Sequence, residues 1–497
     1  MLEGYEMKLR GSMTVFAALV FMLVASMLFA LLEGARAVSL RLYADMTSEL
    51  AVESVFAEYQ PLLWEDYHLL CLDGAYGTGA FSEQYAERAL LSRVSKNIKS
   101  KGVGDSLLKL SCSAAEVEEY QFLTDGEGEV FLHYAASDLK KNFPLLAAQQ
   151  LYEQYVSGHA VIPKEREDDP VEAARQALAD QKQEEKEARP KTVAEKGEEE
   201  NVLDLVSAHK RGFLLDMVLQ ETDELSDRRI ENGESLEHRA LLQGTCAEIP
   251  QVNWYEKILT LEYADKYLSD YGAAAQDRAL TQDRALAYEL EYVVGGKESD
   301  KENLEAVVGR LLLTREAANV VHIMMDGRKR LEVSEMAMML AGVTANAAVI
   351  KAVEYGLIGA WAYVESVLDV RALLHGGKIS FMKGQNQWTS SLMSLPAVLD
   401  SSLRAENCEG GLNYQSYLKG FLFLMQEKQL AYRIMDVMEQ TLRKTELYRN
   451  CRMDSMICAS DYAISYEADT LFWKFAIIGQ EDIGKLVYRN ERSFSYE

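Results

Sequence analysis

The pattern of hydrophobic and polar positions changes most sharply near the start of the chain. Residues 13–32 contain no charge, glycine or proline, and only Thr14 and Ser26 among them are not apolar. Twenty helical residues rise about 30 Å, the thickness of the hydrocarbon core of a bilayer. The pattern predicts a transmembrane helix over residues 13–32 that contacts membrane lipid. The anchoring side chains are expected to include Met13, Phe16, Leu19, Leu23, Leu28 and Leu32.

The helical pattern continues beyond this apolar run. Residues 35–60 contain no glycine or proline, and Pro61 ends the segment. We therefore predict one continuous helix over residues 13–59, about 70 Å long at the usual rise per residue. Its second half is expected to pack on a globular domain through an apolar face at helical spacing, formed by Ala35, Val38, Leu42, Met46, Val52 and Phe56.

Three interpretations of this N-terminus stay open. A cleaved secretory signal fits the small-residue site Ala35-Arg36-Ala37, but the apolar run is longer than the usual core of about 7 to 15 residues. A simple anchor would end at the membrane surface. A helix whose first half is apolar all round and whose second half packs on a globular head has the layout of a type IV pilin or pseudopilin. The uninterrupted pattern favours this third interpretation.

Short alternating stretches predict a few strands. They are residues 67–72, 117–123, 456–466 and 486–496. We expect them to form one small antiparallel sheet against the N-terminal helix. Elsewhere helical periodicity dominates, so the predicted fold class is α+β, mainly α-helical, with a large helical extracytoplasmic body.

The same patterns predict the domain organisation. Residues 164–200 hold 13 acidic and 8 basic residues and few large apolar ones, which indicates a charged, flexible linker without a core face. Residues 336–350 are uncharged but too short for a second span, and they predict a buried core helix. The expected segments are a cytoplasmic leader (1–12), the transmembrane helix (13–32), its extension (33–60), a mixed α/β part (61–163), the linker (164–200), a helical ectodomain (201–450) and a strand-rich end (451–497).

The net charge of the chain limits the classes of molecule that it is expected to bind. The 497 residues carry a formal net charge of −26, which repels nucleic acid, so no nucleic-acid partner is expected. Lys8 and Arg10 precede the apolar run and Arg36 and Arg41 follow it, so charge does not decide orientation. A short head and a very long tail favour an N-terminus inside the cell and a body outside it. The six cysteines are too sparse for a disulfide scaffold and favour buried free thiols.

Candidate chemistry is weak throughout. The sequence has no P-loop, dinucleotide fingerprint, nucleophile elbow or zinc-protease motif. His322 and Asp326 lie one helical turn apart, but two ligands alone do not make a metal site. The motif 375–378 (HGGK) resembles an esterase oxyanion loop, yet its glycines favour a helix end. We predict no catalytic residues, no metal and no cofactor.

Two further groups admit a functional and a structural interpretation. Trp361, Tyr363 and Trp388 could line a groove for peptide or glycan, although the helical pattern around Trp361 favours core packing. Glu365 and Asp369 lie one turn apart and could be paired catalytic acids, although an ion-paired face is the simpler interpretation.

A family resemblance adds to these patterns. The string 11–16 (GSMTVF), the apolar residues after it and the string 32–36 (LEGAR) resemble the N-terminus of TadE/TadG-like proteins, minor pilin-like components of tight-adherence (Tad) pilus systems. Further along, the chain is similar to large membrane proteins of unknown function in Gram-positive anaerobes. The similar stretches are residues 286–292, 295–296, 303–319, 361–374 and 377–378. The resemblance implies membrane anchoring, an extracytoplasmic body and association with a Tad or type IV-like pilus apparatus.

One departure from the pilin pattern stands out. Type IV pilins are cut after a glycine and carry glutamate at the fifth mature position. A cut between Gly11 and Ser12 would place Phe16 there. We therefore expect a non-enzymatic pseudopilin-like or accessory component of a pilus or secretion apparatus, with the subunits of that apparatus as partners. The sequence sets no oligomeric state. A membrane-anchored ligand-binding module or hydrolase is the alternative.

Overall fold

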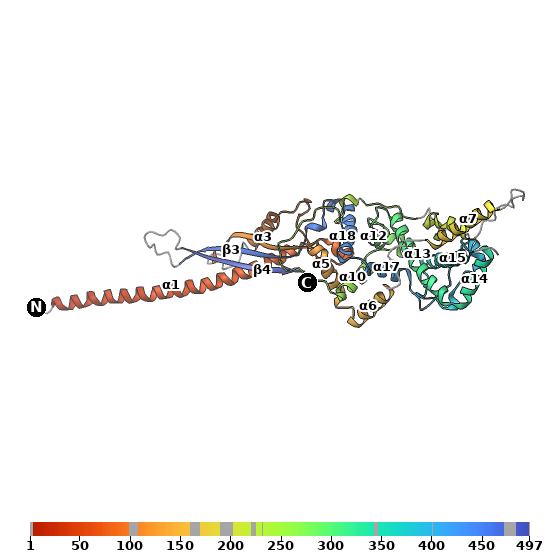
Figure 1. Ribbon diagram of the computed structural model, residues 1–497. Coiled ribbons are helices and arrows are strands. Elements are labelled where there is room, and N and C mark those ends of the chain that lie inside the picture. Colours follow the sequence, from red (N-terminus) through yellow and green to blue (C-terminus); the bar gives the residue numbers. More distant parts are fainter. Residues whose placement is uncertain are drawn as a thin grey trace. The chain divides into compact units, whose positions relative to one another are not determined.

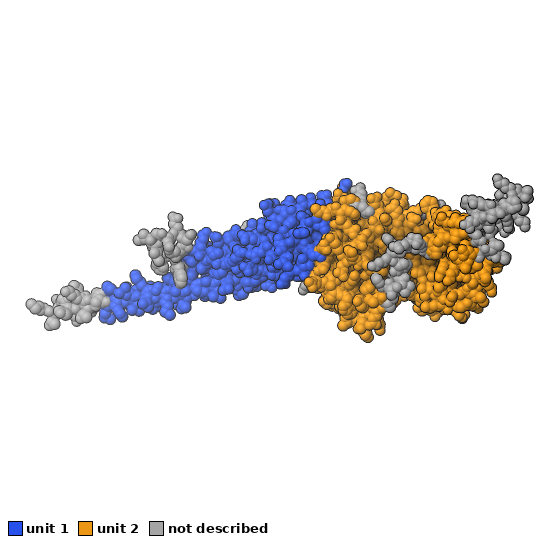
Figure 2. Space-filling model, in the orientation of Figure 1, with its two compact units in different colours: residues 1–126, 241–249, 447–497 blue, residues 127–240, 250–446 orange. Residues whose placement is uncertain are grey.

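The computed structural model describes most of the chain, with side chains of the first helix from Met13 onward. The described residues are 3–98, 108–159, 169–188, 202–219, 225–230, 232–341, 346–399, 401–471 and 484–496. They belong to two compact units, coloured separately in Figure 2: unit 1 is residues 1–126, 241–249 and 447–497, and unit 2 is residues 127–240 and 250–446. The predicted fold class is confirmed: the chain is mainly helical, with a small antiparallel sheet and one long apolar N-terminal helix.

Unit 1 joins the two ends of the chain. Its elements are α1 (Glu3–Phe56), α2 (Pro61–Tyr67), β1 (Leu72–Asp73), α3 (Glu83–Ile98), β2 (Leu110–Phe122), β3 (Met456–Asp469) and β4 (Lys485–Ser495). The domain boundaries predicted from the sequence differ from these units. The prediction separated residues 61–163 from the C-terminal strands, whereas the first part of that range shares a core with those strands.

The long helix α1 is continuous, as predicted. Its large apolar side chains between Met13 and Leu32 are bare, and Phe21 is 74% exposed. It is the one helix in the described part of the chain that is long and apolar enough to cross a membrane. Its second half lies along β3 and β4 (Figure 1). The α1 side chains in the core are Leu40, Ala44, Ala51, Val52, Val55 and Phe56.

The predicted packing face of α1 is partly wrong. Val52 and Phe56 are buried, but Val38, Leu42 and Met46 are 71%, 61% and 53% exposed. Polar residues take their place in the buried stripe, because their hydrogen bonds are satisfied inside the fold. Ser48, for example, is fully buried and donates to the carbonyl of Ala44.

The sheet is organised around β3. Strand β2 pairs with one edge of β3, and β1 and β4 pair end to end with the other edge, all antiparallel. Ile457 at the start of β3 pairs with both Leu72 and Phe122, and Tyr466 further along pairs with Cys112 and Tyr488. The predicted strands at 456–466 and 486–496 are thus confirmed.

The two faces of the sheet differ. Leu90 and Val94 of α3 join α1 in one core with Tyr462 and Tyr466, so both helices cover the same face. The other face carries ion pairs, including Lys485 with Glu467 at 2.9 Å. An antiparallel sheet commonly buries one face and leaves the other solvated.

The predicted strand at 67–72 is wrong for most of its length. The Gln60 side chain caps a helix with Pro61 at its first turn, and that helix, α2, runs to Tyr67. Only Leu72 and the following residue pair as a strand. The strand predicted at 117–123 begins earlier than expected, at Leu110.

Unit 2 is helical. Its helices are α5 (Glu129–Lys140), α6 (Leu145–His159), α7 (Pro170–Ala188), α8 (Val202–Lys210), α9 (Leu214–Val218), α10 (Trp254–Tyr267), α11 (Tyr271–Gln276), α12 (Glu289–Gly295), α13 (Asp300–Met325), α14 (Gly327–Ala341), α15 (Ala347–Leu374), α16 (Leu395–Leu399), α17 (Tyr414–Phe423) and α18 (Glu427–Lys444). Every residue of α15 from Gly356 to its end is buried, and α7, α13 and α14 pack on it. A helix that is apolar nearly all round forms the centre of a core.

The buried helix predicted at 336–350 is wrong. Helix α14 ends at Ala341, α15 begins at Ala347, and residues 342–345 lie outside the described part. Met338 and Met339 are 51% and 65% exposed. Absence of charge alone did not distinguish a core helix from an exposed apolar face.

The linker predicted at 164–200 also needs correction. Residues 160–168 and 189–201 lie outside the described part, but 170–188 form α7. Val171, Ala174 and Leu178 on this helix are buried. Gly356 of α15 allows the close approach, since a Cβ there would lie 2.2 Å from the Cβ of Ala174. Three small or apolar residues at helical spacing were enough to give a charged segment a core face.

Candidate functional site

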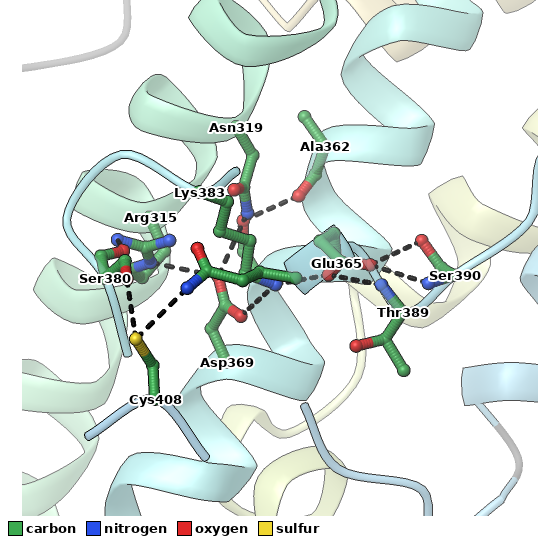
Figure 3. A network of polar contacts seen from close by, with 12 residues as sticks. Arg315, Asn319, Ala362, Glu365, Asp369, Ser380, Lys383, Thr389, Ser390 and Cys408 are labelled. Carbon is green, nitrogen blue, oxygen red and sulfur yellow. Dashed lines mark hydrogen bonds and ion pairs between the residues drawn. The ribbon is translucent and has the colours of Figure 1, made fainter. Parts of the chain in front are cut away.

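The most concentrated chemistry in the described residues is a buried polar network in unit 2. It consists of Arg315 and Asn319 on α13, Glu365 and Asp369 on α15, and Lys383 on the segment that follows α15 (Figure 3). Arg315, Glu365 and Asp369 are fully buried and Lys383 is 6% exposed. We call these five residues the polar network.

Helical spacing explains how the network forms. Arg315 and Asn319 are four residues apart on α13, and Glu365 and Asp369 are four apart on α15, so each pair shares a helix face. The two faces meet because α13 and α15 pack together. The Asn319 side chain donates to Ser366 at 3.0 Å and to Asp369 at 3.2 Å, which aligns the two helices.

Arg315 connects three segments. Its Nε donates to Asp369 Oδ2 at 2.9 Å, and its Nη1 donates to the carbonyls of Ser380 and Phe381. The same Nη1 lies 3.0 Å from the hydroxyl of Tyr417. A planar guanidinium with five donors is suited to such a junction, because it can satisfy acceptors in several directions.

Lys383 and the two carboxylates form the centre of the network. Its Nζ lies 2.6 Å from Asp369 Oδ1 and contacts Glu365 Oε1. Glu365 also accepts from the backbone N–H groups of Thr389 and Ser390 and from the Ser390 hydroxyl. The irregular segment after α15 is therefore held to that helix by charge-assisted hydrogen bonds.

An aromatic cluster adjoins the network. Lys329 of α14 places its Nζ 3.2 Å from the ring centroid of Trp388, and His322 stacks on the same ring at 5.0 Å. Trp361 meets Trp388 edge to face at 5.6 Å. Burial lowers the pKa of Lys329 to about 8, and Glu365 partly opposes that shift. Burial and the neighbouring Lys329 also lower the pKa of His322.

Polar atoms without a hydrogen bond gather in this neighbourhood, although one of them, Asp369 Oδ1, is in an ion pair with Lys383. Within the described residues, seven buried side-chain atoms here make no hydrogen bond: Arg315 Nη2, His322 Nε2, Asp326 Oδ2, Lys329 Nζ, Asp369 Oδ1, Trp388 Nε1 and Thr389 Oγ1. Native proteins leave few such atoms, because each costs about 1–3 kcal/mol. Their concentration marks this region as chemically unusual.

The structure separates the sequence candidates. Trp361, Trp388, Glu365, Asp369 and His322 converge on the network and its aromatic cluster. Asp326 does not pair with His322; instead its carboxylate accepts from the backbone N–H groups at the start of α14. Tyr363 lies apart, with its hydroxyl 3.1 Å from the Met217 sulfur.

His375 lies at a second feature, a cavity of about 590 Å³ in unit 2. His209, Asp216, Arg371 and Arg404 line it with His375. Nδ1 of each histidine lies 2.8 Å from the carbonyl oxygen one turn earlier, so this nitrogen carries the hydrogen. Arg371 donates to backbone carbonyls, whereas Arg404 makes no hydrogen bond or ion pair with the residues described.

The residues predicted for processing and for membrane anchoring belong to unit 1. Gly11 and Ser12 have no described side chains, and the anchoring residues from Met13 to Leu32 are exposed on α1. No group of three histidine, cysteine or acidic side chains within the described ranges could hold a metal ion.

Sequence reasoning missed Arg315, Asn319, Lys329 and Lys383. Lys383 follows Asp369 by fourteen residues, beyond the end of its helix, and no periodic pattern links the two. The available signal was composition: Arg315 shares a helix face with Leu311, Leu312 and Ala318, and a charge buried among apolar residues needs a partner.

The fold and the site together define a class: a mainly helical α+β protein with one membrane-length apolar helix and a charged network inside its helical unit. Residues 192–468 match the family of unknown function DUF5702, and because this match covers more than half of the chain, the protein belongs to that family. The matched region includes the whole polar network and excludes α1. No curated protein and no solved structure matches the chain.

Proposed function

We propose that this protein is a non-enzymatic, membrane-anchored pseudopilin-like or accessory component of a Tad or type IV-like pilus or secretion apparatus. One observation carries the proposal: α1 leaves residues 13–32 bare and packs its second half on a four-stranded antiparallel sheet. A helix with these two halves both anchors a body in lipid and holds it at the membrane surface.

The end of the sheet supports a specific membrane boundary. Arg36 donates to Glu33 at 2.8 Å and to the carbonyl of Leu108 at 2.9 Å, and Glu33 accepts from the backbone of Leu471. These polar contacts begin directly after the bare segment. A charged pair that bonds to the residues just before β2 and just after β3 belongs outside the hydrocarbon core, so we place the end of the span at Leu32.

Lateral contacts in the membrane supply the proposed mechanism. The apolar exposed side chains Val38, Leu42, Met46 and Leu50 continue along α1 beyond the span. Together with residues 13–32 they offer a helix surface for neighbouring pilus or secretion subunits. Phe16 in place of the pilin glutamate favours an accessory role over that of a major fibre subunit.

The proposed orientation places the N-terminus inside the cell and the body outside. Protease treatment of intact protoplasts, followed by detection of an N-terminal and a C-terminal tag, tests it. Loss of the C-terminal tag alone supports the orientation. Loss of the N-terminal tag alone contradicts it.

The mature N-terminus tests the pilin-like part. Membrane fractions from native cells are analysed by N-terminal sequencing and mass spectrometry. A mature chain that begins at Ser12 supports cleavage by a prepilin-type peptidase. A mature chain that begins before Ser12 supports an uncleaved anchor. A chain that begins near Val38 and is released from the membrane would overturn the proposal.

The cavity beside His375 favours a second candidate, a membrane-anchored binding module for a small anionic molecule. The ligand would pair with Arg404, a cation without a protein partner in the described residues of an otherwise acidic chain. Inorganic phosphate is a suitable probe. A thermal stabilisation that saturates in the wild type and is lost in Arg404→Ala supports binding; equal shifts in both proteins contradict it.

A further inference from the structure

The contact between Lys383 and Asp369 has the composition of a covalent bond-forming site. We propose that the Lys383 amine and the Asp369 carboxyl condense to an intramolecular amide (isopeptide) bond, with Glu365 carrying the protons. The bond would join the segment after α15 to the helix itself. This inference is independent of the proposed function.

The geometry places the reacting groups together. Lys383 Nζ is 2.6 Å from Asp369 Oδ1, yet Oδ1 makes no hydrogen bond in the described residues. The amine therefore lies against the carboxyl group without a hydrogen-bonding alignment. Groups held at such distances gain the rate advantage of an intramolecular reaction.

The second carboxyl oxygen is held by donors. Arg315 Nε lies 2.9 Å and Asn319 Nδ2 lies 3.2 Å from Asp369 Oδ2. When nitrogen attacks the Asp369 carboxyl carbon, negative charge develops on this oxygen, and the two donors stabilise it. After the reaction Oδ2 is the amide oxygen and keeps the same hydrogen bonds.

The proton balance needs no outside reagent. Glu365 Oε1, in contact with Lys383 Nζ, accepts a proton and leaves a neutral amine that attacks the Asp369 carboxyl carbon. The C–N bond forms, and the bond from that carbon to Oδ1 breaks. The two protons lost by the ammonium group leave with Oδ1 as one water. Glu365 ends as the carboxylate it was at the start.

Burial favours the product. The side chains of Lys383, Glu365 and Asp369 are 2%, 0% and 0% exposed, and the Trp388 ring lies 5.7 Å from Lys383 Nζ. Condensation removes one buried positive and one buried negative charge, both of which carry a desolvation penalty. Of the charged groups in the polar network, Arg315 and Glu365 then remain, so one cation still balances one anion.

Cysteine usage is consistent with this role. Cys408 is the one cysteine in the sequence of unit 2, so that unit cannot close an internal disulfide. A Lys383–Asp369 amide would provide a covalent link of the kind that other proteins obtain from a pair of cysteines.

Peptide mapping of the full-length protein tests the bond directly. Trypsin cuts an unlinked chain after Lys351, Arg371, Lys378, Lys383 and Arg404. The proposal predicts one joined product of residues 352–371 and 379–404, lighter by one water than the two together and uncut after Lys383. Separate peptides 352–371 and 379–383 at their full masses would overturn it.

Three variants separate the bond from an ordinary ion pair. Asp369→Asn is expected to give the same joined product, because its side-chain amide releases ammonia in place of water. Glu365→Gln removes the proton carrier and is expected to yield separate peptides. Lys378→Arg changes an exposed neighbouring residue and retains the joined product. Circular dichroism monitors folding of each variant, and the wild-type digest decides the question even if Glu365→Gln does not fold.

Discussion

The hydroxyl oxygens of Ser48 in α1 and Tyr466 in β3 lie 2.8 Å apart in the core of unit 1, although 418 residues separate them in the chain. Both side chains are fully buried. The pair joins the long helix to the central strand by a polar contact inside an apolar core. Such a contact aligns the helix on the sheet, because a displaced helix would leave the buried Tyr466 hydroxyl without its Ser48 partner, whereas Ser48 keeps its bond to Ala44.

Removal of one hydroxyl is expected to destabilise unit 1. Tyr466→Phe leaves Ser48 without this partner and should lower the free energy of unfolding by about 1 kcal/mol. Thermal and urea denaturation of the detergent-solubilised protein measures the change. Ser39→Ala is the matched control, since Ser39 is exposed on the same helix and, among the described residues, bonds only to the carbonyl of Ala35. Equal effects of the two changes would contradict the assigned role.

The packing of α7 on α15 depends on Gly356. An alanine there would place its Cβ 2.2 Å from that of Ala174, and we expect Gly356→Ala to destabilise unit 2 by about 1–3 kcal/mol. Gly420→Ala is the control: Gly420 lies inside α17 with open space around it, and alanine favours a helix by up to about 1 kcal/mol. Denaturation midpoints should therefore move in opposite directions. A neutral Gly356→Ala would show that the two helices do not approach this closely.

Burial makes stability depend on pH through Glu291 of α12. Desolvation, and next the charge of Asp270, raises its pKa to about 8. Between the pKa of the unfolded chain and pH 8, the folded protein therefore holds a proton that the unfolded chain has released. The stability contributed by Glu291 is fully present below the pKa of the unfolded chain, and it is lost as pH rises through 8. Glu291→Gln should lose less stability than the wild type between pH 5 and pH 8, as measured by melting temperatures.

A matched exposed residue checks the pH effect. Glu298 is exposed, and Glu298→Gln should follow the wild-type pH profile. If Glu291→Gln retains the full wild-type slope, the titration arises elsewhere; the buried Asp436, with its pKa raised by burial to about 7, is the next group to replace.

The proposed span predicts where charge is tolerated on α1. Each arginine near the centre of a span opposes insertion by about 2.5–3.5 kcal/mol, so Leu19→Arg with Leu23→Arg should release much of the protein from the membrane fraction. Leu42→Arg is the control, because Leu42 is 61% exposed on the same helix beyond the proposed boundary. Fractionation and immunoblotting measure retention. If Leu42→Arg released the protein to the same extent, the membrane span would have to extend beyond Leu32.

Local sequence patterns were sufficient to predict the elements in which apolar residues recur at a regular spacing. The continuous α1 and the strands β3 and β4 were predicted because apolar runs and alternation extend over many residues there. Prediction was wrong where polar residues are buried or where a charged helix packs through a few small side chains. Ser48, Arg36 and Ala174 are such residues, and each is accommodated by a partner distant in sequence.

The sequence by itself determined that one helix is long and apolar enough for a membrane and that the rest is mainly helical with a small sheet, because length and periodicity are local properties. The tertiary structure alone decided which strands join α1 and which charges meet inside unit 2. Arg315, Asp369 and Lys383 come together through the packing of α13 on α15 and the return of the following segment. A buried charge selects its partner by position in space, and nothing in the local sequence encodes that position.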